Sequence, residues 1–378
     1  MRMLLMMCSL ICVVTAASCT TAAEEDVTES PMLLKLEPGK WTKIHEQKKG
    51  DKVRFMRQAH GGSCFDTKRG RLILFGSNTH GRDWKNTPFF FDLVKLEWAR
   101  LYPPDPKATY KVNEKGLPVA GEKGDHPWAM HTFGAVEYDP ERDEMVVACA
   151  PKHMVPGRFS NALKDLWGKV KRHPTWTLRL DTNEWVALDC KPVHFFPYCT
   201  AFDTDRNVVI GHSPSGVFEL GVEPRKWTRV VRGGKFGWHT NAAYDAKHKA
   251  LVVFGTNKNA NDIVTYSVET GEYKMMPTPG DRPPKDQHNP MAFHPKLGKT
   301  AILVDHVLER DGRKVTKART ETWLYDLGVD EWERVETATL PFGCGMNYNM
   351  EYDPEHGVLL LVTGSYGDAT RVWALRLD

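Results

Sequence analysis

The chain alternates short apolar runs with turn-forming residues, and this pattern recurs six times. In each copy, an aromatic residue followed by an aspartate or histidine precedes a polar turn, and an apolar run comes after the turn. The turns carry Asp, Pro and Gly, the residues that β-hairpins require. The six apolar runs read RLILFGS, EMVVACA, NVVIGHS, ALVVFGT, TAILVDH and VLLLVTG. Each copy therefore predicts a strand, a tight turn and a buried strand.

Each copy also predicts a third strand, and five copies predict a fourth. The third strands read FFFDL, TWTLRL, GVFEL, IVTYSV, TETWLYDL and RVWALRL, and the fourth strands carry Trp98, Trp185, Trp227, Tyr273 and Trp332. The sixth copy ends at Asp378 without a fourth strand, but residues 38–44, which include Trp41, match the missing pattern. We therefore predict an all-β fold, a six-bladed β-propeller with four-stranded blades. An N-terminal strand joins the C-terminal blade and closes the ring, which hides the sheet edges.

A family resemblance supports this prediction. The stretch TWLYDL at residues 322–327, followed by EWERV at residues 331–335, resembles the kelch-type propellers of the galactose oxidase group. The resemblance covers residues 38–378 at the level of the repeat. The usual Gly-Gly after the second strand is absent, and only Gly76, Gly255 and Gly364 lie near that place. The radical-copper set of galactose oxidase cannot be placed in this sequence, so we carry over no copper chemistry.

The N-terminus has the features of an export signal. Arg2 precedes an apolar segment at residues 4–17 that is too short to span a bilayer, and small residues follow it. We expect residues 1–23 to be a signal peptide, 24–37 a linker and 38–378 the propeller. The run from Ala16 to Cys19 also resembles a bacterial lipobox, with Cys19 as the lipidated residue. The expected location is periplasmic, extracellular or lipid-anchored at the cell envelope, and the lipid on Cys19 is the one membrane contact expected.

Charge and cysteine content narrow the classes of partner. The 51 basic and 48 acidic residues leave a net charge of +3, without the basic stripe of a nucleic-acid binder, so we expect no nucleic-acid partner. We also expect the protein to be a monomer. Five cysteines follow the signal, and an odd number leaves at least one unpaired. Their pairing stays open, and the cysteines in question are Cys64, Cys149, Cys190, Cys199 and Cys344.

One face of the predicted ring carries the long connections, and binding residues usually lie on such connections. They are residues 102–130, 150–173 and 305–319. In the second of them, Ser160 and the spacing of the next apolar residues predict a short amphipathic helix. We favour a helix that covers the loop over one that acts as a lid.

Histidines gather at the same face. His60, His239 and His288 occupy one register in three blades, and strand alternation puts His131 on the same side. Other candidate residues lie on or beside this face: His80, Arg82, Arg158, Tyr198, Trp84, Trp128, Trp238 and Asn347.

Three interpretations of the histidines stay open. They can hydrogen-bond between blades, or His60, His239 and His288 can hold a divalent metal such as Zn or Mn. In the third interpretation, His131 or His239 acts as a general base, Tyr198 returns a proton, and Arg82 and Arg158 neutralise a substrate carboxylate. The remaining candidates, His60, His80, His288, Trp84, Trp128, Trp238 and Asn347, would then bind substrate, with the tryptophans as sugar-stacking platforms.

The acid–base set resembles the equipment of propeller polysaccharide lyases, which implies β-elimination on a uronate sugar. The sequence contains no nucleophile elbow, phosphate loop or dinucleotide fingerprint. The leading hypothesis is an exported carbohydrate-active propeller, a lyase or a sugar epimerase acting on an anionic sugar. The alternatives are a non-catalytic module that binds glycan or protein, and a metal-dependent enzyme.

Overall fold

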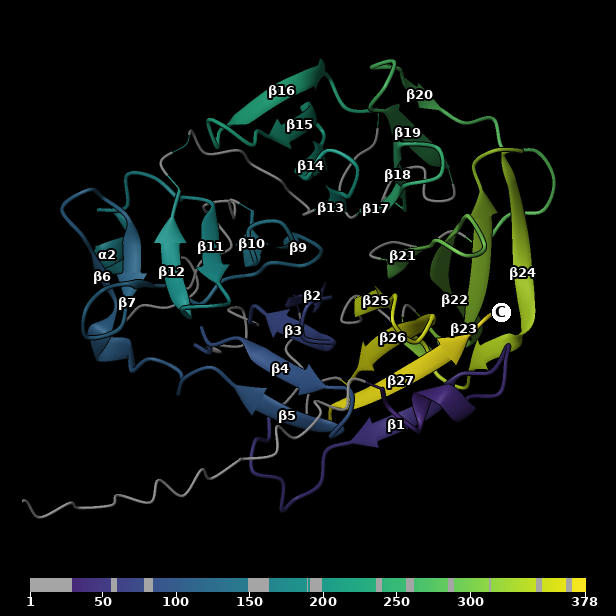
Figure 1. The fold of residues 1–378 in the computed structure, drawn as a ribbon, viewed down its shortest axis with the longest axis horizontal. Helices are drawn as coiled ribbons and strands as arrows, with labels where there is room; N and C mark the ends of the chain where they lie inside the picture. The colour runs from purple at the N-terminus through teal and green to yellow at the C-terminus, as the bar shows by residue number, and fades with distance from the viewer. Residues whose placement is uncertain are drawn as a thin grey trace, which may run out of the picture.

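In the computed structural model of the chain, β-strands are by far the main secondary structure. The structure describes residues 29–55, 60–77, 84–148, 163–188, 190, 199–235, 240–255, 262–284, 289–312, 314–344, 349–364 and 369–378. These residues form six four-stranded antiparallel sheets and one three-stranded sheet (Figure 1). The predicted all-β class is therefore confirmed.

Each of the first five four-stranded sheets uses consecutive strands. They are, in chain order, β2 (Gly62–Asp66), β3 (Arg71–Phe75), β4 (Phe89–Asp92) and β5 (Glu97–Arg100); β9 (Val136–Asp139), β10 (Glu144–Val147), β11 (Trp176–Arg179) and β12 (Glu184–Ala187); β13 (Cys199–Asp203), β14 (Val208–Ser213), β15 (Gly216–Leu220) and β16 (Trp227–Arg232); β17 (Asn241–Asp245), β18 (Ala250–Phe254), β19 (Ile263–Ser267) and β20 (Tyr273–Met275); and β21 (Met291–His294), β22 (Lys299–Asp311), β23 (Lys314–Asp326) and β24 (Glu331–Leu340).

The sixth sheet joins the two ends of the chain. It contains β25 (Asn349–Asp353), β26 (Val358–Thr363), β27 (Arg371–Arg376) and β1 (Thr42–Glu46). Strand β1 pairs antiparallel with β27, and the Nε atom of Arg371 lies 2.8 Å from a carboxylate oxygen of Glu46. The predicted pairing of the N-terminal strand beside the C-terminal strand is thus observed.

The first strand of each four-stranded sheet lies innermost (Figure 1). Strands β2, β9, β13, β17, β21 and β25 contact one another in that order, and β25 in turn contacts β2. Neighbouring sheets bury their faces against each other, as Val146 of β10 does against Val209 of β14. Because both faces of the second strands are covered, strands such as β10 and β18 are buried along their whole length. This explains why these segments read as continuous apolar runs.

The aspartate that ends a first strand caps the turn after it. Asp203 accepts hydrogen bonds from the backbone N–H groups of Asp205 and Arg206 at 3.0 and 3.1 Å, and the Arg206 guanidinium lies 2.6 Å from it. An Arg or His three residues on pairs with the aspartate in four other sheets, in the pairs Asp66–Arg69, Asp139–Arg142, Asp245–His248 and Asp353–His356. In the fifth sheet, His294 replaces the aspartate and accepts from the N–H of Leu297 at 3.3 Å.

One connection expected at the functional face is instead part of a sheet. Residues 305–319 were predicted to form a long loop, but β22 and β23 run 13 residues each and pair through this segment. Pairs such as His306 with Arg319 continue the ladder beyond the core. The prediction was wrong because this part of the hairpin has no buried face, so no regular apolar pattern marks its strands in the sequence.

The other two predicted connections pack together at the outer rim. Within residues 102–130 lie the 3-10 helix η3 (Lys107–Thr109) and the three-stranded sheet of β6 (Lys111–Val112), β7 (Pro118–Ala120) and β8 (His126–Pro127). The expected helix is only four residues long, α2 (Lys164–Trp167), and Ser160 lies outside the described residues. Leu163 and Val170 share a core with the three-stranded sheet, away from the centre of the molecule (Figure 1). The helix therefore covers this insertion and is no lid over the innermost strands.

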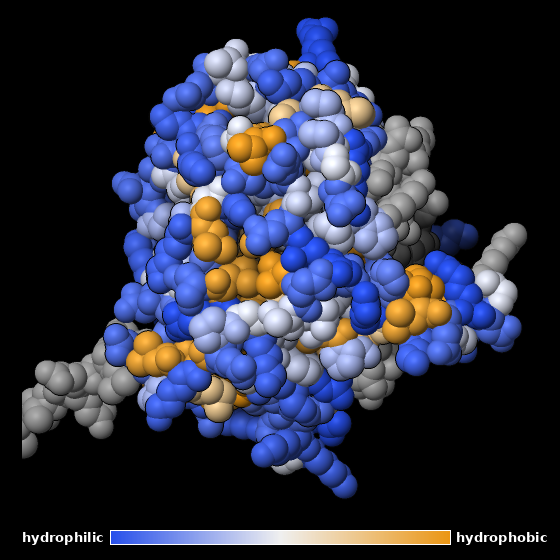
Figure 2. Space-filling model, turned by 90° about the vertical axis from the view of Figure 1, so that its right-hand side faces the viewer, coloured by the Kyte–Doolittle hydropathy of each residue, from blue (hydrophilic) through white to orange (hydrophobic). Residues whose placement is uncertain are grey.

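The predictions about the N-terminus fall mostly on residues that the structure does not describe, whereas three of the cysteines are described. Residues 1–28, which hold the expected signal peptide and Cys19, lie outside the described residues. Within the expected linker, the structure has the 3-10 helix η1 (Leu33–Lys35). Cys64, Cys190 and Cys344 are buried and none of them is in a disulfide. No helix in the described part of the chain is long and apolar enough to cross a membrane. On the side shown in Figure 2, hydrophobic residues form small separate groups among hydrophilic ones.

Candidate functional site

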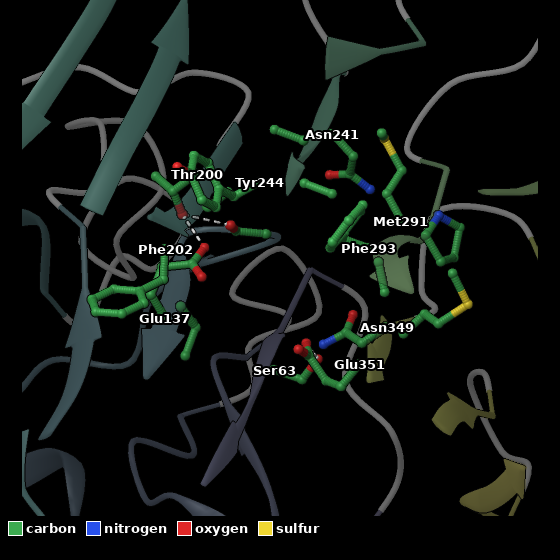
Figure 3. Close-up of a pocket in the computed structure, with 18 of the residues that line it drawn as sticks. Ser63, Glu137, Thr200, Phe202, Asn241, Tyr244, Met291, Phe293, Asn349 and Glu351 are labelled. Carbon is green, nitrogen blue, oxygen red and sulfur yellow. Dashed lines mark hydrogen bonds between the residues drawn. The ribbon is translucent and has the colours of Figure 1, made fainter. Parts of the chain in front are cut away.

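A cavity of about 260 Å³ lies at the centre of the molecule, between the innermost strands (Figure 3). All six four-stranded sheets contribute to its wall through their first strands or the residues next to them. Its polar side chains are Ser63, Glu137, Thr200, Asn241, Asn349 and Glu351, and its larger apolar side chains are Phe133, Phe202, Tyr244, Met291, Phe293 and Met350. The wall thus mixes carboxyl, hydroxyl and amide groups with aromatic rings, as small-molecule sites do.

Glu137 is fixed at the boundary between the second and third sheets. The side-chain oxygen of Thr200 on β13 lies 2.7 Å from a Glu137 carboxyl oxygen and 2.7 Å from the backbone carbonyl oxygen of Gly134. Burial raises the pKa of Glu137 well above its usual value and outweighs the hydrogen bond from the backbone N–H of Phe202, which lowers it. Glu137 therefore favours its protonated form.

Glu351 holds the equivalent place between the sixth sheet and the first. The hydroxyl of Ser63 on β2 donates to its carboxyl group at 2.5 Å. Burial raises the pKa of Glu351 to about 7, and the bond from Ser63 opposes that rise. A carboxyl group that titrates near neutral pH and is partly exposed to a cavity can act as a general acid or base.

The repeat contained a signal for these two glutamates that sequence reasoning missed. Each glutamate stands two residues before the aspartate that ends its strand, and each hydroxyl stands three residues before the aspartate of the following sheet. At the other four boundaries these two positions pack as apolar pairs: Cys64 with Val136, Ala201 with Ala242, Ala243 with Met291, and Ala292 with Met350. In the other four repeats, the position of the glutamate holds Cys or Ala. A glutamate there therefore indicates a position that does not serve apolar packing between the sheets.

Two of the predicted histidines come together at one edge of this region. The ring centroids of His60 and His131 are 4.4 Å apart, and that of Phe133, a cavity residue, lies 4.7 Å from His60. His60 directly precedes Gly61, another cavity residue, and has a left-handed backbone with φ 71°. His131 is fully buried. In this structure His60 is the more accessible of the two, and the ring of the predicted base His131 does not reach solvent.

The described tryptophans do not offer the sugar platforms that the sequence suggested. Trp128 is fully buried in the core of the insertion, and its indole N–H donates to the carbonyl oxygen of Val119 at 2.8 Å. In this structure the Trp128 ring is not available as a platform, because it packs in the core that the insertion shares with the first and second sheets. Trp84 is partly buried, and the ammonium group of Lys107 lies 4.4 Å from its ring centroid.

The other candidates from the sequence lie outside the described residues. These are His80, Arg82, Arg158, Tyr198, Trp238, His239, His288 and Asn347. Two of the three suggested metal ligands are among them, and the described residues contain no cluster of three or more His, Cys, Asp or Glu side chains suited to a metal ion.

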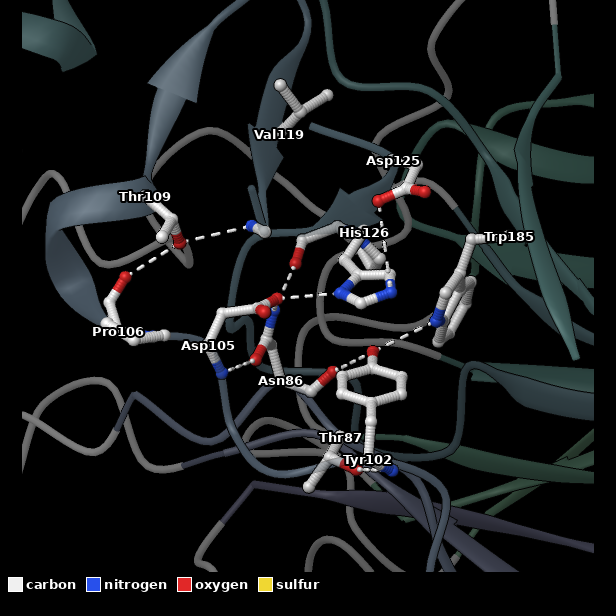
Figure 4. Close-up of polar contacts among 12 residues, drawn as sticks. Asn86, Thr87, Tyr102, Asp105, Pro106, Thr109, Val119, Asp125, His126 and Trp185 are labelled. Atoms are coloured by element: carbon white, nitrogen blue, oxygen red, sulfur yellow. Dashed lines mark hydrogen bonds and ion pairs between the residues drawn. The ribbon is translucent and has the colours of Figure 1, made fainter. Parts of the chain in front are cut away.

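A second polar cluster lies at the outer rim, where the insertion meets the first and second sheets (Figure 4). A carboxylate oxygen of Asp105 lies 2.8 Å from both the Nδ1 atom of His126 and the amide nitrogen of Asn86. The His126 ring stacks on Tyr102 with centroids 4.1 Å apart, and the Trp185 indole donates to the Tyr102 hydroxyl at 3.0 Å. These side chains hydrogen-bond or stack with one another, and the cluster therefore links the three-stranded sheet to β12.

Comparisons with known proteins leave the family unassigned. No family model matches the chain, and no curated protein matches it. Among solved structures, the chain is similar to Kuenenia stuttgartiensis hydrazine synthase, with a TM-score of 0.48 and 12% sequence identity over 83% of this chain and 76% of that one.

Proposed function

We propose that the chain is a six-bladed, kelch-like β-propeller that carries out acid–base chemistry on a uronate-type sugar, as a lyase or an epimerase. The blade count rests on the six four-stranded sheets and on the series of contacts among their first strands. The kelch-like assignment rests on the repeat residues, above all TWLYDL and EWERV. Export through residues 1–23, with lipidation of Cys19 as a variant, belongs to the same proposal.

The single observation that carries the chemistry is Glu351 in the wall of the central cavity. It is partly exposed to the cavity, it is hydrogen-bonded on one side by Ser63, and its pKa is raised to about 7. An acid or base is most effective when its pKa lies near the working pH. Glu351 thus fills the role that the sequence had suggested for His131, whose ring is fully buried.

The rest of the wall suits a sugar. The side chains of Asn241, Asn349 and Thr200 carry donors and acceptors for hydroxyl groups, and Phe293 offers an apolar ring. In a uronate, the carbon next to the carboxylate carries the acidic proton. Glu351 would take that proton and form an O–H bond, while the electron pair stays on the substrate. In elimination, the electron pair forms the new double bond as the bond to the oxygen substituent breaks, and the protonated Glu351 passes its proton to the leaving oxygen. In epimerisation, a water molecule gives a proton to the opposite face of the carbon, and the hydroxide that remains takes the proton from Glu351.

The proposal is tested with a panel of uronate oligomers and polymers. A lyase product contains a new double bond and raises the ultraviolet absorbance, whereas an epimerase exchanges the acidic proton for deuterium in D₂O, which NMR detects. We expect one of these signals from the wild type and its loss in Glu351→Gln. Glu355→Gln is the matched control because Glu355 is exposed on a turn after the same strand, β25.

Other outcomes favour the alternatives. Glycan binding without either signal, and unchanged in Glu351→Gln, would replace the enzyme with a binding module. A stoichiometric metal in elemental analysis, together with loss of activity on chelation, would favour the metal-dependent enzyme that His60, His239 and His288 suggested.

A further inference from the structure

We propose that the two cavity glutamates have different roles: Glu351 alone transfers the proton, and Glu137 is a permanently protonated positioning residue whose carbonyl oxygen accepts from a sugar hydroxyl. This inference rests on the proposed function, whose substrate class it uses. It depends on the count of hydrogen atoms available at each glutamate.

At Glu137, one hydroxyl proton serves two contacts. The side-chain oxygen of Thr200 lies 2.7 Å from the carbonyl oxygen of Gly134 and 2.7 Å from Glu137. A carbonyl oxygen only accepts, and a threonine hydroxyl has one proton to donate. When Thr200 donates to Gly134, its contact with Glu137 is a hydrogen bond only if Glu137 carries a proton and donates it. Both bonds form together only when Glu137 is protonated.

At Glu351, the count is different. Ser63 is buried, with 6% of its surface exposed, and its hydroxyl makes one hydrogen bond, the one to Glu351. Its proton is therefore available to an ionised Glu351. The carboxyl group of Glu351 can gain and lose a proton while the bond from Ser63 is kept, whereas ionisation of Glu137 breaks a bond.

The backbone N–H of Phe202 also donates to Glu137 and lowers its pKa, but burial has the larger effect. The other neighbouring groups agree with this division. The other titratable side chains described on the cavity wall are Tyr244 and Tyr352, and burial raises the pKa of both, so they stay neutral. Burial raises the pKa of the Cys64 thiol on β2, so it stays neutral as well. No Lys, Arg or His lies among the cavity residues that the structure describes.

The consequence concerns charge. If both glutamates were ionised, the cavity would hold two negative charges and repel a sugar carboxylate. With Glu137 protonated, the cavity holds one negative charge when Glu351 is ionised, and none after Glu351 has taken the substrate proton. A protonated carboxyl group also offers its carbonyl oxygen to a sugar hydroxyl at no cost in charge.

Glutamine substitutions separate the roles, since glutamine resembles a protonated glutamate. In Glu137→Gln, the new side-chain amide can donate to Thr200 and its oxygen can still accept, so we expect this variant to keep kcat/KM within about 10-fold of the wild type. Glu351→Gln cannot take a proton, and we expect a loss of about 100-fold or more, mainly in kcat. Glu137→Ala removes the acceptor and should raise KM more than it lowers kcat. Equal losses in the two glutamine variants would overturn the assignment.

A second measurement needs no substrate, so its failure differs from failure of the proposed function. The side-chain carboxyl groups are labelled with ¹³C-glutamate and followed by NMR from about pH 5 to 9. We expect one signal, missing in Glu137→Gln, to stay protonated throughout, and a second, missing in Glu351→Gln, to titrate near neutral pH. In Glu355→Gln, both of these signals should remain. An ionised Glu137 at neutral pH would overturn the proposal whether or not a substrate is found.

Discussion

Glu351 on β25 accepts a hydrogen bond of 2.5 Å from Ser63 on β2, across the boundary between the sixth and the first sheets. Glu137 and Thr200 form the same kind of contact between the second and third sheets, whereas the other four boundaries hold apolar pairs at these positions. The innermost layer is therefore a repeating packed structure with two polar interruptions, and both of them open on the cavity.

Removal of the Ser63 hydroxyl should change how Glu351 titrates. The bond from Ser63 lowers the pKa of Glu351 against the effect of burial, so Ser63→Ala should raise that pKa above about 7. The basic form would then appear at a higher pH. The ¹³C titration of Glu351 and the pH profile of kcat/KM measure the change. Ser63→Thr keeps a hydroxyl and is the control; the same upward shift in both variants would contradict the role of the bond.

The Glu351 carboxyl should make stability depend on pH. Its pKa is raised from 4.5 to about 7 in the folded chain, so the folded state holds this proton more tightly than the unfolded state does. Its favourable contribution is complete below pH 4.5 and is lost as the pH rises through about 7. Relative to wild type, Glu351→Gln should therefore gain on the order of 2 kcal/mol in free energy of unfolding between pH 4 and 8.

Urea unfolding at several pH values measures this difference. Glu355→Gln, on the exposed turn, should show no such gain, and the other titrating groups cancel because each comparison is made with the wild type at the same pH. A constant difference between Glu351→Gln and the wild type across the range would contradict the raised pKa.

Trp41 should be needed for the sheet that joins the chain ends. It is buried, with 6% of its surface exposed, and its indole N–H donates to Thr322 of the neighbouring sheet at 3.0 Å. Trp41→Ala leaves a cavity and removes one hydrogen bond between the sheets, which should lower the free energy of unfolding by about 3–5 kcal/mol. Thermal and urea unfolding measure the loss. Val329→Ala, at a position 62% exposed, should change little; a loss as small at Trp41 would argue against its place in the core.

His294 should not tolerate the aspartate that the other five sheets use. It is fully buried, burial lowers its pKa so that the ring is neutral, and residue 297 is Leu where the other sheets have Arg or His. His294→Asp buries a charge without a cation and should cost on the order of 3 kcal/mol. His294→Asp combined with Leu297→Arg should recover part of that loss, as the pair Asp203–Arg206 suggests. Equal stability of the single and double variants would contradict this account of the turn.

Trp128 should act on stability and leave ligand binding alone. Because its ring is fully buried in the insertion, Trp128→Ala should lower the free energy of unfolding by about 3–5 kcal/mol. Affinity for any sugar that the wild type binds, measured calorimetrically at a temperature where the variant is folded, should stay the same. A clear loss of affinity with little loss of stability would restore the platform that the sequence suggested.

The strands, their grouping in fours and an N-terminal strand in the last sheet could all be predicted from the sequence, although that strand covers residues 42–46 where 38–44 was expected. Alternation with period two, turn residues and repeated spacing are properties of residues close together in the chain, so they can be detected in the sequence alone. Five of the six repeats contain all four strands, and one N-terminal segment matches the strand that the sixth repeat lacks. Prediction from the sequence erred at residues 305–319, where the hairpin has no buried face and therefore no apolar pattern to mark its strands. The sequence also did not show that Trp128 packs in the core that the insertion shares with the first and second sheets.

Which side chains contact one another depends on the tertiary fold. Glu137 and Glu351 stand in the same register of two different repeats, but their facing one cavity depends on how the innermost strands contact one another. Their protonation depends on burial and on hydroxyl groups supplied by the next sheet, Thr200 and Ser63. Desolvation and hydrogen bonding depend on the groups that lie near a side chain in space, and a residue's position in the sequence does not specify those groups.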